Sequence, residues 1–240
     1  MPSVRAVAAS CLDVTGNLSI RRDVFGYPYG AVGVPLKLKD HLTRIRGHAI
    51  NLSPILVGHD PGFPPGDEFT IQKAQRFQTG IHIMRELYAQ VEVGVRKIFW
   101  GRIPIADAGD FTVVDKKEAT KLTRAWSGDN DGIDVFLVTS ITDAAGWSNV
   151  KGPCDKTKLV RTGAVVELIS PDLEFGILLA HEVGHYLGLK HGNDIHNIMG
   201  TDENNDGKGE TDERSVQITD DQGETMGEHC SMHGPCGGSS

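Results

Sequence analysis

Apolar residues between positions 69 and 90 recur at steps of three and four, the pattern of a helix that buries one face. Ile71, Phe77 and Met84 are among the residues that follow this spacing. Over residues 91–103 the apolar positions change to a period near two, which predicts a strand. A helix followed directly by a strand favours a protein in which helices pack against a sheet.

Other apolar segments predict further strands. Residues 49–57 have strand-like content. Residues 133–141 form an apolar run bounded by glycines and aspartates, which is typical of a strand covered on both faces and therefore central in its sheet. Residues 146–150 and 163–169 predict two shorter strands, and we expect an edge strand in this region.

A second helix is predicted over residues 173–187. Ser170 can cap its first turn, and Pro171 suits the first helical position. Gly188 can adopt a positive φ and end the helix, so the chain is expected to turn sharply there. A short helix is also predicted over residues 219–226.

Length and composition fit one domain with a substantial core. The chain has 240 residues, of which 39% are hydrophobic and 23% charged, as in ordinary globular proteins. Short apolar pieces between glycines and prolines over residues 4–38 predict an N-terminal hairpin, and prolines and glycines within residues 59–67 predict a loop. The fold class that follows is α/β (α+β) with helices on a mixed sheet.

The net charge excludes two classes of partner. A formal charge of −8 disfavours binding to nucleic acid or to an anionic membrane surface, since both reward clustered Lys and Arg. No stretch is apolar enough to cross a bilayer, and the first 11 residues lack a signal-peptide core. A mature fragment given a new Met1 would look the same. The compartment stays open on these observations.

Four cysteines bear on the compartment. Cys11, Cys154, Cys230 and Cys236 could form two bridges in three connectivities, and an even count favours an oxidising environment. The close spacing of Cys230 and Cys236 favours a bridge between them, with free thiols as the alternative.

Three histidines and one glutamate carry the candidate chemistry. His181 and His185 are four residues apart on the second helix, so their imidazoles project from one face and can bind a single ion. Glu182 lies where its carboxylate can act as a base on a water bound to that ion. The turn at Gly188 allows His191 to approach as a third ligand, which leaves one zinc position open for catalysis. A bare His-Glu-x-x-His could be a chance helix fragment, whereas the added Gly188 and His191 make chance improbable.

The segment from His181 to His191 resembles the long zinc motif of the metzincin clan of metallopeptidases. Asn197-Ile-Met-Gly200 is similar to the Met-turn of that clan, in which Met199 would form an apolar floor beneath the zinc ligands. Gly184 and the Leu-Gly-Leu run are similar to the matrixin and pappalysin branches, while Gly192 stands where Ser or Thr is usual. The branch within the clan therefore stays open.

The resemblance implies a zinc-dependent endopeptidase with a backing helix, a twisted mixed sheet, an active-site helix and a small C-terminal subdomain. We expect such a protein to be secreted or extracellular and monomeric, with a protein or peptide as its partner. It divides the chain into a β-rich N-terminal segment (1–40), an upper catalytic subdomain (41–188) and a lower subdomain with the Met-turn (189–240). Substrate main chain would pair with an edge strand that includes Ala145, Gly146, Trp147 and Ser148.

A second ion site is suggested by an acidic loop after the Met-turn. Its residues match the pattern of an EF-hand calcium loop, with candidate ligands Asp202, Asn204, Asp206, Lys208 and Glu213. No amphipathic helix precedes the loop, and Gly209 stands where an apolar residue is usual. A solvated acidic loop is therefore the alternative to calcium binding.

Two other functions compete with a peptidase that uses His181, His185, His191 and Glu182. One is a metal-dependent binding module that does not turn over. The other is a zinc enzyme whose third ligand is acidic, such as Glu203 or Glu210.

Overall fold

The computed structural model describes residues 47–58, 71–142, 144–156, 161–169, 171–201 and 209–234. The hairpin predicted over residues 4–38, the rest of the N-terminal segment to residue 40 and the loop predicted over 59–67 lie outside these residues.

The core of the fold is a mixed six-stranded sheet with the strand order β2-β1-β5-β8-β7. Its strands are β1 (Ala49–Val57), β2 (Gly94–Ile98), β3 (Gly101–Ile103), β5 (Ile133–Val138), β7 (Gly146–Ser148) and β8 (Ala164–Glu167). Strands β2, β3 and β5 run parallel to β1, β8 runs parallel to β5, and β7 is antiparallel to β8. The predicted central position of the 133–141 run and the predicted edge strand near residue 146 are confirmed.

Side chains on β5 alternate between two cores, one on each face of the sheet. Ile133, Val135 and Leu137 belong to the larger core, and Phe136 and Val138 belong to the smaller one. All six residues of β5 are buried, because helices cover both faces. This explains why the sequence of this strand is a continuous apolar run.

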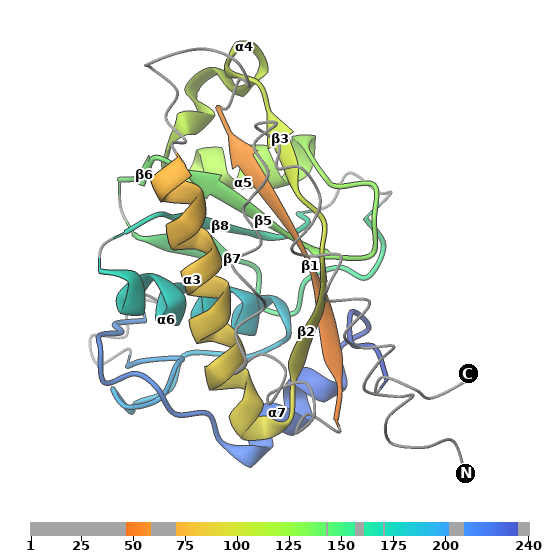
Figure 1. The fold of residues 1–240 in the computed structure, drawn as a ribbon, viewed down its shortest axis with the longest axis vertical. Coiled ribbons are helices and arrows are strands. Elements are labelled where there is room, and N and C mark those ends of the chain that lie inside the picture. The colour runs from red at the N-terminus through yellow and green to blue at the C-terminus, as the bar shows by residue number, and fades with distance from the viewer. Residues whose placement is uncertain are drawn as a thin grey trace.

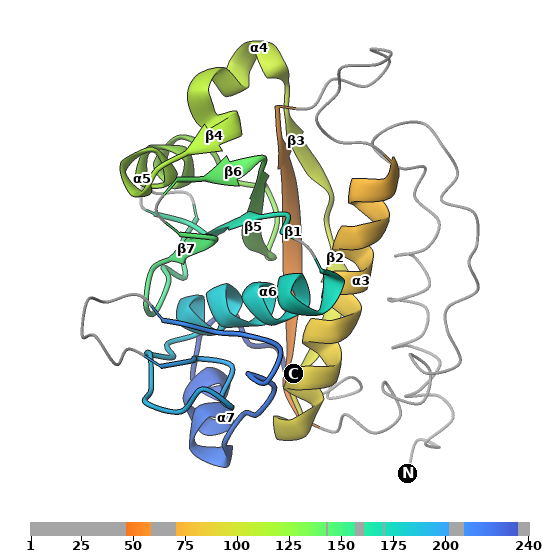
Figure 2. The same ribbon diagram turned by 90° about the vertical axis from the view of Figure 1, so that its left-hand side faces the viewer.

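Helices α3 (Ile71–Tyr88) and α6 (Asp172–Tyr186) cover one face of the sheet and contact each other. Small residues permit this contact, since a Cβ on Gly176 would lie 2.5 Å from Ile83 Cγ2. At the end of α3 the Tyr88 hydroxyl donates a 2.7 Å hydrogen bond to the Ala180 carbonyl of α6. Figure 2 shows α6 crossing α3, with the C-terminal part of the chain beyond it. The backing helix and the second helix predicted from the sequence are therefore confirmed.

Helix α5 (Lys116–Ala125) covers the other face, and α3 and α5 lie on opposite sides of β1 (Figure 2). Near it are α4 (Ile105–Ala108), the 3-10 turn η2 (Gly109–Thr112) and a two-stranded parallel sheet of β4 (Val113–Val114) and β6 (Ser140–Ile141). None of these elements before residue 133 was predicted.

Three predicted boundaries are wrong. The strand predicted over 91–103 begins only at Gly94, because η1 (Ala89–Val91) is a 3-10 turn and Glu92 has φ +56°. It is also divided into β2 and β3, which pair separately with β1 (Figure 1). The strand predicted over 133–141 ends at Val138. Pro171 is the N-cap of α6 rather than its first helical residue, and Ser170 lies outside the described residues.

The C-terminal part contains α7 (Asp220–Gly227), which confirms the predicted short helix. A disulfide joins Cys154 to Cys230, 76 residues apart, so the predicted bridge between Cys230 and Cys236 is wrong. Spacing along the chain did not decide the pairing; the packing of the segment after β7 against the end of α7 did. Among the described helices, none combines the length and apolar character needed to cross a bilayer.

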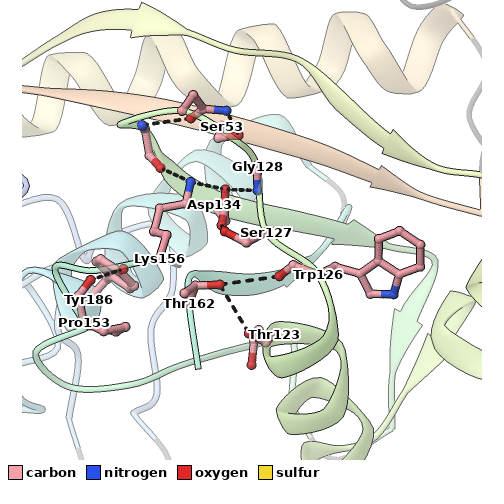
Figure 3. A network of polar contacts seen from close by, with 12 residues as sticks. Ser53, Thr123, Trp126, Ser127, Gly128, Asp134, Pro153, Lys156, Thr162 and Tyr186 are labelled. Atoms are coloured by element: carbon pink, nitrogen blue, oxygen red, sulfur yellow. Dashed lines mark hydrogen bonds and ion pairs between the residues drawn. The ribbon is translucent and has the colours of Figure 1, made fainter. Parts of the chain in front are cut away.

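A polar network around the buried carboxylate of Asp134, formed with Ser127, Gly128 and Lys156, joins this segment to β5 (Figure 3). The Asp134 carboxylate accepts hydrogen bonds from Ser127 Oγ at 2.8 Å, Gly128 N at 3.1 Å and Lys156 Nζ at 2.7 Å. Lys156 Nζ also donates to the Gly132 carbonyl at 2.8 Å. Each charged group of this Asp134 network is thus paired inside the protein.

Candidate metal centre

Helix α6 supplies the first two histidines of the site. Every residue from Phe175 to Tyr186 is buried, so the helix lies within the protein rather than on its surface. His181 and His185 are 5% and 7% exposed, and their ring centroids are 4.6 Å apart. One turn of helix therefore places two imidazoles side by side within the core.

The end of α6 directs the third histidine back towards the first two. Gly188 has φ +109°, Gly188 N donates to the His185 carbonyl, and Leu189 N donates to the Gly184 carbonyl, both at 2.9 Å. This pair of bonds is a Schellman motif, which only a residue tolerant of positive φ can close without strain. The predicted end of the helix at Gly188 is confirmed.

His191 then meets the other two histidines. One ring nitrogen from each of His181, His185 and His191 lies within 4.8 Å of the others. The Nε2 atoms of His185 and His191 are 2.9 Å apart. Among the described residues this is the one group of His, Cys, Asp or Glu side chains arranged to hold a metal ion. Glu210, the acidic third ligand considered above, is not part of it, and Glu203 lies outside the described residues.

Backbone carbonyls fix the orientation of two of the rings. His181 Nδ1 lies 2.8 Å from the Ile198 carbonyl oxygen, and His185 Nδ1 lies 2.8 Å from the Leu189 carbonyl oxygen. Since a carbonyl oxygen only accepts, each Nδ1 must carry the proton. The neutral ring then presents an Nε2 lone pair to a metal ion, which is the usual arrangement of metal-ligating histidines.

Burial also keeps these imidazoles neutral. Burial is the largest cause that lowers their pKa values; repulsion between the imidazoles adds to it, and the hydrogen bonds to Ile198 and Leu189 oppose it. The net result is a pKa of about 3 for His181 and about 4 for His185. Both rings are therefore in the metal-binding form at neutral pH.

Glu182 is a buried carboxyl group with unused hydrogen-bonding capacity. It is 5% exposed, and its Oε2 atom is buried with no hydrogen-bond partner among the described residues. Burial raises its pKa to about 8. A cation bound by the neighbouring histidines would act in the opposite direction, because it favours the charged carboxylate.

Two glycines make room at the site. A Cβ on Gly146 of β7 would lie 2.6 Å from Glu182 Cγ, so the edge strand passes directly over the glutamate. A Cβ on Gly209 would lie 2.6 Å from His191 Nε2 and 2.9 Å from His181 Cε1. The sequence analysis missed both roles, and no local pattern signals them, because both depend on contacts between distant segments.

A cleft of about 1120 Å³ opens onto the histidines and Glu182. The residues of the predicted substrate strand line it: Ala145, Gly146, Trp147 and Ser148. Strand β7 pairs with β8 on one side only, so its other edge has no neighbouring strand in the described sheet. The segment Gly209–Asp212, with Arg214, lines the cleft as well.

Met199 lies buried against α6. It is 0% exposed, and a Cβ on Gly184, between the two histidines of the helix, would lie 3.2 Å from its Sδ atom. Gly200 N donates to the Asn197 carbonyl at 2.8 Å, and Gly200 has φ +61°, so residues 197–200 form a tight turn. Residues 197–200 therefore turn as expected, and the Ile198 carbonyl within this turn orients His181. The role of Met199 as the floor of a metal site stays a prediction.

Most of the predicted calcium ligands cannot be placed. Asp202, Asn204, Asp206 and Lys208 lie outside the described residues, and Glu213 is exposed. Thr201 and Glu210 pair through two backbone hydrogen bonds of 2.8 and 3.0 Å, so the two ends of this loop lie together. Calcium binding stays a prediction.

Comparison with known proteins gives partial structural likeness. No family model and no curated protein matches the sequence. Metalloproteinase-II from Bacteroides fragilis is similar over 74% of this chain and 52% of its own, with 13% identity and a TM-score of 0.46. Archaemetzincin from Methanopyrus kandleri is similar over 73% of this chain and 93% of its own, with 18% identity and a TM-score of 0.42. The chain thus spans about half the length of the Bacteroides protein.

Proposed function

We propose that this protein is a zinc-dependent endopeptidase of the metzincin type. The observation that carries the proposal is the convergence of His181, His185 and His191 next to Glu182, whose buried Oε2 atom has no hydrogen-bond partner among the described residues. Three neutral imidazoles suit zinc, and a site with three protein ligands keeps a position open for chemistry. A structural zinc site would instead close the fourth position with a further side chain.

The residues present fit a zinc ion. Carbonyl groups hold Nδ1 of His181 and His185, so the Nε2 atom of each ring carries the lone pair that a metal ion needs. Gly209 has no side chain to fill the space beside His191 Nε2. A zinc ion bound there supplies Lewis acidity, which lowers the pKa of water and polarises a carbonyl group.

Glu182 performs the proton transfers in this proposal. Its carboxylate accepts the proton that the attacking water loses, and it then delivers this proton to the nitrogen of the leaving amine. The unpartnered Oε2 atom gives Glu182 the free lone pairs that a base needs. Burial excludes bulk water, which strengthens every electrostatic interaction in the site.

Strand β7 positions the substrate. An extended peptide can add to its unpaired edge, so that main-chain hydrogen bonds hold the peptide along the cleft and over Glu182. Because these contacts involve the backbone, they suit an endopeptidase that accepts many sequences.

The test is Glu182→Ala, with Glu224→Ala as a matched control on the exposed face of α7. We expect cleavage of a denatured protein to fall about 10²- to 10⁴-fold in the first variant and to stay at the parent rate in the control. Zinc content, measured by elemental analysis, should stay at one ion per chain in both. Cleavage by Glu182→Ala at the parent rate would overturn the mechanism.

A non-catalytic, metal-dependent binding module is the competing function. Digestion of a broad peptide library with and without a chelator separates the two. Chelator-sensitive cleavage supports the peptidase, and failure to cleave under varied calcium and pH, with zinc bound, supports the binding module.

A further inference from the structure

The side chains of Asn197 and Gln222 form a reciprocal amide pair beneath the metal centre. Asn197 Nδ2 donates to Gln222 Oε1 at 2.8 Å, and Gln222 Nε2 donates to Asn197 Oδ1 at 2.9 Å. Asn197 is 7% exposed and belongs to the turn that contains Met199, whereas Gln222 belongs to α7. Two hydrogen bonds between these side-chain amides thus join segments that are 25 residues apart in the sequence.

Gln222 is itself held in place by the start of α7. Thr219 N donates to Gln222 Oε1 at 3.0 Å, and Gln222 N donates to Thr219 Oγ1 at 3.3 Å, which completes a capping box. Since Oε1 accepts from Thr219, the amide nitrogen of Gln222 must point towards Asn197. The capping box therefore fixes the orientation of the amide that Asn197 meets.

Asn197 passes this constraint to the turn. Its Oδ1 atom also accepts from Met199 N at 2.9 Å, and its carbonyl accepts from Gly200 N at 2.8 Å. Ile198 lies between these residues. Its N–H group donates a hydrogen bond to the Gln217 carbonyl at 2.9 Å, and its carbonyl accepts one from His181 Nδ1 at 2.8 Å. The peptide that orients His181 is therefore held from both sides.

We propose that Gln222 is a positioning residue for the metal centre, acting through Asn197 and the Ile198 carbonyl on the imidazole of His181. This role rests on the proposed zinc site. Gln222 touches neither metal nor substrate; it restricts the turn that sets the direction of His181 Nε2. Partners of metal ligands are commonly needed for affinity because they fix ring orientation before the ion binds.

The substitution Gln222→Glu separates this role from helix capping. The new carboxylate keeps the acceptor for Thr219 N and for Asn197 Nδ2, because glutamate also completes a capping box. It loses the Nε2 donor and places an oxygen against Asn197 Oδ1, so one half of the amide pair becomes repulsive. Thr219→Ala does the opposite, since it removes the Oγ1 cap and leaves the amide pair unchanged.

The experiment measures zinc affinity by chelator competition, and the visible absorption of the cobalt-substituted protein, for the parent, Gln222→Glu and Thr219→Ala. We expect about tenfold weaker zinc binding and an altered cobalt spectrum for Gln222→Glu. Thr219→Ala should keep the affinity and spectrum of the parent while unfolding at lower denaturant concentration. If Gln222→Glu does not fold, the neutral Gln222→Met carries the same expectation.

Parental zinc affinity and cobalt spectrum in the Gln222 variant would overturn the positioning role while leaving the proposed peptidase intact. An equal loss of affinity in Thr219→Ala would also overturn it, since helix stability alone would then explain the effect. A parent protein that binds no zinc would instead overturn the proposed function, and this role with it.

Discussion

Two buried carboxyl groups in this protein have opposite surroundings. Asp134 on β5 is 0% exposed and accepts hydrogen bonds from Ser127, Gly128 and the ammonium group of Lys156. Glu182 on α6 is 5% exposed, and its Oε2 atom has no partner among the described residues. Burial of a charged group costs free energy unless partners offset it. Partners offset this cost at Asp134 but not at Glu182 Oε2.

The difference separates a carboxyl group whose hydrogen bonds are all satisfied from one that keeps the free capacity a proposed base needs. The Asp134 network connects β5 to the segment after β7 (Figure 3). Because its charged groups pair with each other, it has little capacity to bind anything else. Glu182 keeps unused lone pairs beside three histidine nitrogens, at a cost in stability. Perturbed titratable groups in a cleft are typical of functional sites, whereas closed ion pairs are typical of the scaffold.

The largest expected effect comes from removing the cation of the Asp134 network. Lys156→Met leaves the Asp134 carboxylate buried without its cation, and we expect the free energy of unfolding to fall by about 3–5 kcal/mol. Denaturant titration followed by circular dichroism measures it. Glu182→Gln is the matched change at the metal centre and should not lower the free energy of unfolding of the metal-free protein. An equal loss of stability in both variants would remove the distinction between the two sites.

Removal of the disulfide next to the Asp134 network should have the next largest effect. Cys154 belongs to the same segment as Lys156, and its bond to Cys230 closes a loop across 76 residues. Replacing both cysteines by serine should lower the free energy of unfolding by about 2–4 kcal/mol, chiefly because the unfolded chain gains freedom. Denaturant titration under oxidising conditions checks this. No change on replacement would show that the ion pair alone secures the segment.

A smaller effect is expected from filling the space beside the three histidines. In Gly209→Ala the new Cβ would overlap the His191 ring, so the ligand must shift by an amount that costs about 1–3 kcal/mol. Zinc affinity should fall roughly 5- to 150-fold, as measured by chelator competition. Gly234→Ala is the control, because a Cβ there meets nothing within 4 Å. Parental affinity in Gly209→Ala would mean that the space beside His191 is not needed for the ion.

The smallest effect concerns pH and a histidine between the two sites. His229 Nε2 donates to the Gly152 carbonyl at 3.0 Å, and its Nδ1 accepts from Ser231 N at 3.2 Å, so the neutral ring is satisfied on both sides. Burial lowers the pKa of His229, repulsion from Lys151 lowers it further, and the bond to Gly152 opposes the shift.

Below the ordinary histidine pKa of 6.5, the unfolded chain therefore binds this proton more readily than the folded protein does. The stability that neutral His229 contributes is present above that pH and is lost as the pH falls towards the folded pKa. The difference in unfolding free energy between the parent and His229→Gln should change by at most about 1.4 kcal/mol per pH unit. A difference that is constant between pH 4 and 8 would contradict the expectation.

The sequence predicted those parts of the site that depend on local geometry. Helical spacing places His181 and His185 on one face, and Gly188 turns the chain towards His191, so α6 and its end could be predicted from residues a few positions apart. The carbonyls of Leu189 and Ile198 could not, because nothing in a side-chain pattern tells which backbone groups a ring will meet.

The missed helix α5 shows a different limit. Few of its residues are apolar, which hides the helix in a largely polar stretch, although its buried residues Ala119, Leu122 and Thr123 follow helical spacing. A signal was available nonetheless: Asp115 precedes the helix, and its carboxylate accepts from Glu118 N at 2.7 Å, the expected geometry of an N-cap. The pairing of Cys154 with Cys230 had no such signal, since it depends on tertiary packing.

The hydrogen bond from His181 to Ile198 spans 17 residues and has a consequence for folding. Because a metal ligand on α6 takes its orientation from the C-terminal part of the chain, docking of that part and readiness for the ion are one thermodynamic event. By linkage, zinc bound at the proposed site would oppose undocking of the described C-terminal residues, 189–201 and 209–234, as strongly as their undocking would weaken zinc binding. Protection of these amides from hydrogen exchange should therefore rise with the concentration of free zinc.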